Sequence, residues 1–246
     1  MLACCALLGC GRVDFDPLAL PIDASVDAPI DAPPLPAMFV QARQPTSGSM
    51  ATITTVMDLG ADDLVLVSVH WNNATATATV SDTLGLAWQP TPQVGISTGC
   101  QTPGNATNLQ VFYAHAGAGG ADTITSAQSD TTGADPMGML VVEYAQAGAL
   151  GAMSSVKAMS ASSAVHAGPI VADGPGLVYA VFHDSVGGGT MTPGSGYMAR
   201  VFDTAAYAMA EDQMIAAGGT FDPDGMLPSG KNDACWVGSA LVFAVP

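Results

Sequence analysis

The stretch D-L-V-L-V-S-V-H-W, Asp63–Trp71, decides the fold class of this chain. In an extended strand, Leu64, Leu66 and Ser68 share one face and the three valines between them share the other, because side chains alternate with a period of two. β-Branched residues also favour strands over helices. The stretch therefore predicts a strong β-strand.

Apolar or alternating segments of the same kind recur along the rest of the chain. They are separated by Gly, Pro, Asp and Asn, which end strands and form turns. No segment carries the sustained 3.6-residue apolar period of a helix, although Ala and Met make the window 204–217 ambiguous. The further predicted strands are 51–56, 108–115, 122–128, 138–145, 176–183, 206–217 and 235–245.

This pattern predicts an all-β fold, a jelly-roll-like antiparallel β-sandwich of about ten strands. We expect residues 38–246 to form it as a single domain, since no internal repeat and no internal linker are evident in the sequence. The chain has 246 residues, of which 49% are apolar, so it can bury a sizeable core.

The charge balance is strongly acidic and limits the range of partners. Five Lys and Arg face twenty-one Asp and Glu, which gives a formal net charge of −16. A surface so poor in cations repels phosphate backbones and anionic lipid headgroups. The composition therefore predicts no nucleic-acid partner and no attraction to membranes through surface charge.

The amino terminus, M-L-A-C-C-A-L-L-G-C, is apolar up to Cys10 and then turns polar. Its segment 7–10 resembles the lipobox of bacterial lipoproteins, although no Lys or Arg precedes the apolar stretch. The resemblance implies that residues 1–10 are a signal segment, that Cys10 carries a diacylglycerol, and that this lipid binds the protein to a membrane. The alternative is an ordinary secretion signal, or an apolar tail with chance cysteines.

Residues 11–37 are predicted to be a disordered tether. Within them Asp14–Pro36 contains six prolines, five aspartates and no Lys or Arg. Proline removes hydrogen-bond donors and the aspartates repel one another, so the segment stays extended. At about 3.1 Å per residue it would hold a domain roughly 60–70 Å from a membrane. The predicted location is the cell envelope, on the outer membrane or the cell surface.

Six segments of the body carry a further resemblance. They are D-D-L-V-L-V-S-V-H-W (62–71), V-S-D-T-L-G-L-A-W (80–88), residues 111–125, V-V-E-Y-A-Q (141–146), G-L-V-Y-A-V-F (176–182), and residues 210–221 with 236–245. Together with the strand-like segments around them, they resemble a secreted β-sandwich module that recurs in uncharacterised bacterial surface proteins. The resemblance implies a fold and an extracytoplasmic location. It supplies no catalytic residues.

Cys100 and Cys235 are the only cysteines beyond the signal segment. In an oxidising compartment an even pair usually forms a disulfide, and we expect one here. The alternative is two buried thiols. No CxxC or Cys/His spacing surrounds them, so they do not indicate a metal site.

Trp71 and Trp88, with Trp236, could supply an aromatic platform on which a sugar stacks. The alternative is that these rings belong to the core, where aromatic residues in strands are commonly found. The sequence leaves both interpretations open.

Two aspartates in F-D-P-D-G, Asp222 and Asp224, form an oxygen-rich turn that could bind calcium weakly. The alternative is a solvated acidic turn, since Asp, Pro and Gly form turns anyway. No other cofactor is indicated. The four histidines show no metal-binding spacing and are expected to be ordinary strand-end or surface residues: His70, His115, His166 and His183.

The sequence is compatible with more than one class of function. The sequence has no Gly-x-Ser-x-Gly motif, and its only glutamates are Glu143 and Glu211. Glu143 is expected to bond to backbone, to Arg200 or to a tyrosine rather than to act in catalysis. The leading interpretation is a lipid-anchored binding or structural module whose partner is an extracellular glycan or protein. The alternatives are a secreted glycan-active hydrolase and a carbohydrate-binding module.

Overall fold

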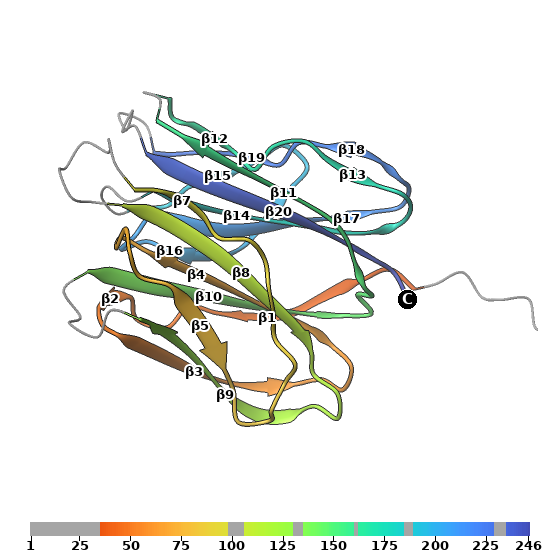
Figure 1. Ribbon diagram of the computed structural model, residues 1–246. Coiled ribbons are helices and arrows are strands. Elements are labelled where there is room, and N and C mark those ends of the chain that lie inside the picture. The colour runs from red at the N-terminus through yellow and green to blue at the C-terminus, as the bar shows by residue number, and fades with distance from the viewer. Residues whose placement is uncertain (1–34, 98–105, 130–134, 160–161, 185–188, 229–234) are drawn as a thin grey trace, which may run out of the picture. The chain divides into compact units, whose positions relative to one another are not determined.

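Strands are the regular elements in the part of the chain that the computed structural model describes, residues 35–97, 106–129, 135–159, 162–184, 189–228 and 235–246. Their pairings are antiparallel, and those residues contain no helix (Figure 1). The prediction of an all-β antiparallel sandwich is therefore confirmed. None of the described residues belongs to a helix that could cross a membrane.

Two sheets belong to residues 38–145, the first half of the fold. The first inner sheet has the order β1-β10-β4-β8-β6, with β2 on β10 and β7 on β8. Its strands are β1 (Met38–Arg43), β2 (Gly48–Ser49), β4 (Leu64–Trp71), β6 (Gln89–Pro90), β7 (Val94–Ile96), β8 (Thr107–His115) and β10 (Pro136–Ala145). The first outer sheet has the order β3-β9-β5 and consists of β3 (Thr52–Leu59), β5 (Ala78–Ser81) and β9 (Gly120–Gln128).

Residues 150–244, the second half, also form an inner sheet and an outer layer. The second inner sheet has the order β11-β20-β14-β17-β16. Its strands are β11 (Leu150–Ala158), β14 (Gly176–Asp184), β16 (Met198–Asp203), β17 (Ala208–Ile215) and β20 (Trp236–Ala244). The second outer layer consists of β12 (Ala164–His166), β13 (Ile170–Ala172), β15 (Thr192–Pro193), β18 (Gly219–Phe221) and β19 (Asp224–Met226), paired as β12-β19-β15 and β13-β18.

Three hydrophobic cores separate these layers, which Figure 1 shows stacked from β3 and β9 to β12 and β13. The valines of β4 pack toward the first outer sheet, whereas Leu64 and Leu66 pack toward the second inner sheet. In β14, Val178, Ala180 and Phe182 face the second outer layer, and the alternate residues face the first half. Both strands are buried throughout, which explains why neither shows an apolar–polar alternation.

The two halves repeat one topology. β1, β10, β4 and β8 of the first half correspond in order to β11, β20, β14 and β17 of the second. Both edge strands also carry a bulge at the equivalent place, after Phe39 in β1 and after Leu150 in β11. The repeat that was not evident in the sequence is therefore one of strand order.

The strand predicted over 206–217 is confirmed. Strand β17 lies in the ambiguous window 204–217, where burial of both faces outweighs the helix preference of Ala and Met. The described residues form twenty strands where about ten were expected, because eight of these strands have only two or three residues. The signal segment and the tether, residues 1–37, lie almost wholly outside the described residues, and β1 begins at Met38.

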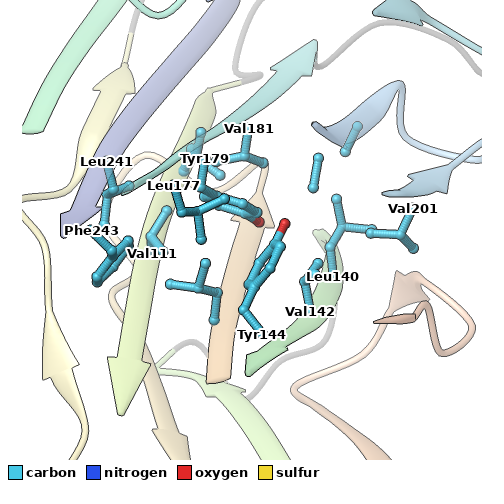
Figure 2. Packing of buried hydrophobic residues seen from close by; sticks show 14 of the residues in the cluster. Val111, Leu140, Val142, Tyr144, Leu177, Tyr179, Val181, Val201, Leu241 and Phe243 are labelled. Carbon is cyan, nitrogen blue, oxygen red and sulfur yellow. The ribbon is translucent and has the colours of Figure 1, made fainter. Parts of the chain in front are cut away.

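A polar network crosses the central core between the two inner sheets. The Tyr144 hydroxyl donates to Asp212 Oδ2 at 2.6 Å, and Arg200 donates to both oxygens of Asp212 at 2.7 and 2.9 Å. The hydroxyls of Tyr179 and Ser68 lie 2.8 Å apart. Figure 2 shows the Tyr144 and Tyr179 hydroxyls among aliphatic side chains. Burial is the main reason why the pKa of each tyrosine is raised above its ordinary value.

Candidate functional site

The three tryptophans have different surroundings. Trp71 is fully buried in the core beneath the first outer sheet, and its indole N–H donates to the Ala76 carbonyl at 3.1 Å. Trp236 is also buried. Only Trp88 is partly exposed, with one side of its ring packed on the same core as Trp71. Trp71 therefore cannot form a surface platform, and Trp88 can.

The turn before Trp88 fixes the position of its ring. Asp82 accepts hydrogen bonds from the backbone N–H of Gly85 at 2.6 Å and of Leu86 at 3.1 Å. Its other oxygen accepts the Trp88 indole N–H at 2.7 Å. Gly85 has a φ of 76°, a left-handed conformation that glycine adopts without strain. The spacing Asp82–Gly85–Trp88 was the sequence signal for this arrangement, and the sequence interpretation overlooked it.

Trp88 borders a groove of about 420 Å³, which we call the Trp88 groove. Thr77 and Thr79 lie on its wall, together with the amides of Gln93 and Gln110. Gln110 donates to the Thr91 carbonyl at 2.7 Å, and Gln93 donates to Asn108 Oδ1 at 3.0 Å. The groove thus combines an immobilised aromatic ring with amides whose orientation is already set, and its volume lies within the usual range for ligand sites.

A second polar site lies at the junction of the two halves. His70 and His183 occupy equivalent positions of β4 and β14, and their ring centroids are 4.6 Å apart. Both lie one residue before the end of their strands, as expected, but each is only 1% exposed, so neither is a surface histidine. The pairing of the two halves brings them together, and a linear sequence does not show such a juxtaposition.

The hydrogen bonds around these histidines link residues of the two halves. They do not activate a serine as a nucleophile. Asp203 lies 3.1 Å from His70 Nε2 and accepts the Ser47 hydroxyl at 2.9 Å. Burial raises the pKa of Asp203, but its hydrogen bonds with His70 and Ser47 outweigh that effect and lower it. Burial lowers the pKa of His183, which is thus neutral. Because Ser47 donates to a carboxylate and not to an imidazole, this is not the serine–histidine arrangement of hydrolases.

Comparison with known proteins gives no match. No family model, no curated protein and no solved structure is similar to this chain. Function must therefore be inferred from the chemistry of its own sites.

Glu143 is fully buried in β10 and has structural partners. Gln41 donates to its Oε2 at 2.6 Å and the Gly60 N–H donates to its Oε1 at 2.7 Å. Arg200, one of its expected partners, binds Asp212 instead. The neighbouring Asp63 has a pKa raised to about 6 by burial, by its hydrogen bond with Glu143 and by the charges of Glu143 and Asp62.

The Asp63 carboxyl makes stability depend on pH. Its pKa is about 6 in the folded chain against 3.8 ordinarily, so the folded state holds this proton more tightly and stability falls as pH rises from about 4 to 6. We expect Asp63→Asn to be more stable than the native protein above pH 6 and no more stable below pH 4. Urea unfolding at several pH values measures this. The exposed Asp173→Asn serves as control, and an equal gain at both pH values would contradict the prediction.

Glu211 lies in β17 of the second inner sheet, whereas Glu143 lies in β10 of the first. It is fully buried, accepts the Gly194 N–H at 3.0 Å, and has a pKa raised to about 8, mainly by burial. Asp224 lies near it in β19, while Asp222 is exposed in the turn before that strand. Within the described ranges no group of three or more His, Cys, Asp or Glu could hold a metal ion, so no third side chain of these types joins the two aspartates.

The cysteine predictions lie partly outside the described residues. Cys235 is buried directly before β20, and its carbonyl accepts the Thr107 hydroxyl at 3.4 Å. Cys100 belongs to the segment 98–105 and Cys10 to the segment 1–34, neither of which the structure describes. The disulfide between Cys100 and Cys235 and the lipid on Cys10 therefore stay predictions.

Proposed function

We propose that this protein is a glycan-binding module of the bacterial cell surface and that the Trp88 groove is its binding site. The observation that carries the proposal is the half-exposed Trp88 ring, held by Asp82 beside the fixed amides of Gln93 and Gln110. A sugar ring offers an apolar face to an aromatic ring and hydroxyls to amides. The groove supplies both kinds of contact without rearrangement.

A peptide is the less suitable ligand for this groove. An extended peptide binds a sheet by pairing with the N–H and C=O groups of an edge strand. The edge beside Trp88 is β6, which has only two residues, contains Pro90 and is followed by Pro92. Proline has no N–H to donate, so this edge offers few backbone donors to an added strand.

In this proposal the lipid on Cys10 holds the protein at the cell envelope. Residues 11–37, rich in Pro and Asp, would carry the β-sandwich away from the membrane. A binding module needs such reach to meet polysaccharides beyond the membrane surface. The resemblance of segment 7–10 to a lipobox supports this part of the proposal.

Trp88→Ala is expected to weaken glycan binding about 30-fold or more, the loss that follows when a central aromatic contact worth about 2 kcal/mol is removed. Trp88→Phe should keep part of the affinity because it retains an aromatic face. The measurement is a glycan array with the purified full chain, followed by titration calorimetry on the glycans that bind.

Leu84→Ala is the matched control, since Leu84 is 40% exposed on the same turn and does not line the groove. It should bind like the native chain. Thermal unfolding of each variant separates lost binding from lost structure. A native chain that binds no glycan, or a folded Trp88→Ala variant that binds normally, would refute the proposal.

A further inference from the structure

We propose that the ligand of this protein is an acidic polysaccharide, one of whose carboxylates binds Lys157 while a neighbouring sugar stacks on Trp88. This inference rests on the proposed function and names the class of glycan. It comes from a second cavity beside the Trp88 groove and from the charges along both.

The second cavity continues the first. It has a volume of about 540 Å³ and shares the Gln93 side chain with the Trp88 groove. Asn108 and Gly95 line it on the first half, and Ser155 and Lys157 line it on the second. We call the two cavities together the furrow. A chain molecule seated on Trp88 can pass over Gln93 into the second cavity, whereas a single sugar would occupy only one of them.

The furrow crosses the junction of the two halves along strand β7. β7 pairs with β8 of its own sheet and lies against β11, the edge strand that carries Ser155 and Lys157. Gly95 lies at the centre of β7, where a Cβ atom would collide with the Asn108 side chain. Because glycine has no Cβ, the Asn108 amide has room at this position. The Oδ1 atom of Asn108 accepts a hydrogen bond from Gln93 there. The middle of the furrow is therefore shaped by fixed amides.

Charge selects the kind of polysaccharide. The chain contains five Lys and Arg against twenty-one Asp and Glu, yet the described residues that line the furrow include Lys157 and no carboxylate. No ion pair of Lys157 is found among the residues that the structure describes, whereas Arg200 is bound to Asp212. Lys157 is exposed and is thus available to an anion.

The negative charge of the whole chain does not oppose this contact. At physiological salt the electrostatic field of exposed charges decays over about 8 Å, so the groups nearest the ligand decide its preference. Asp82 is a carboxylate close to the furrow, and it accepts the N–H groups of Gly85, Leu86 and Trp88. Its charge is therefore largely compensated by donors of its own turn.

The described lining also lacks the pair of carboxylates with which glycosidases cleave their substrates. The fully buried Glu143 and Glu211 do not line either cavity. The furrow is thus suited to holding an acidic polysaccharide.

The test compares acidic polysaccharides with their neutral counterparts. Pectate, alginate and hyaluronate are immobilised beside their carboxyl-reduced forms, and binding of the full chain is measured by biolayer interferometry at 50 and 300 mM salt. We expect at least one acidic form to bind about two- to fivefold more tightly than its reduced form, the usual size of one exposed ion pair. This preference should shrink at the higher salt concentration.

Lys157→Gln should lower binding of the acidic form to the level that the same variant shows for the reduced form, and Lys157→Arg should retain the preference. Arg43→Gln is the control, because Arg43 is an exposed cation that does not line the furrow. Equal binding of acidic and reduced forms, or an unchanged preference in Lys157→Gln, would overturn the inference. If that binding still depended on Trp88, the proposed function would be retained. Absence of binding to every form would overturn both.

Discussion

Replacing Arg200 by Met is expected to lower the free energy of unfolding by about 3–5 kcal/mol, the usual loss when one partner of a buried ion pair is removed. Asp212 is 1% exposed and receives two hydrogen bonds from Arg200. Among the described residues, the Tyr144 hydroxyl is then the remaining donor to Asp212, and a neutral hydroxyl cannot neutralise the charge. Arg200 also lies over the Phe39 ring, 4.3 Å from its centroid, so the loss includes a cation–π contact.

Chemical unfolding of matched variants tests this. Arg200→Met combined with Asp212→Leu should recover part of the stability, because the unpaired charge is removed together with its partner. Arg43→Met is the control for loss of a cation, and as an exposed residue it should change stability by no more than about 0.5 kcal/mol. A single Arg200→Met variant as stable as Arg43→Met would show that the pair contributes nothing.

Trp71→Ala is expected to destabilise the protein by about 3–5 kcal/mol, the range for removing a large aromatic residue from a core. Its ring is fully buried in the core between the first inner and outer sheets, and the indole N–H is bonded to Ala76. Removal leaves a cavity at the end of β4 and an unpaired carbonyl beside it. The midpoint of urea unfolding measures the loss.

Trp88→Ala gives the matched comparison, since it removes the same side chain from a half-exposed site. It should cost clearly less stability than Trp71→Ala but should abolish most glycan binding. Trp71→Phe should fall between the native chain and Trp71→Ala, because it keeps most of the ring volume. If both tryptophan variants lost equal stability, the division between a core ring and a surface ring would be wrong.

The sequence predicted the strands well because the alternation of side chains is a local property. Asp63–Trp71 is strand β4 but for its first residue, and 108–115 and 176–183 match β8 and β14 to within one residue. What the pattern did not reveal is layering. β4 and β14 are apolar on both faces. This feature distinguishes a strand buried between two layers from a strand with one solvent-exposed face.

The candidate site was only partly predictable. Trp88 was among the candidate residues, but the hydrogen bond from its indole to Asp82 was not predicted. The hydrogen bond from Gln93 to Asn108 and the contact between β11 and β7 depend on packing between residues distant in sequence. The contact of His70 with His183 likewise arises because two strands distant in sequence face each other across the central core.

The repeated topology has a consequence for how the chain folds. Among the described residues, the strand pairings lie within residues 38–145 or within residues 150–244, and the two inner sheets meet mainly through side chains. Long-range pairing between the ends of the chain is therefore not needed, which lowers the contact order below that of a sandwich whose first and last strands are neighbours. A chain that emerges amino terminus first can complete one half before the other exists. During that interval Leu64, Leu66 and Tyr144 are exposed to water on the first inner sheet. A partly synthesised chain would aggregate through this apolar face.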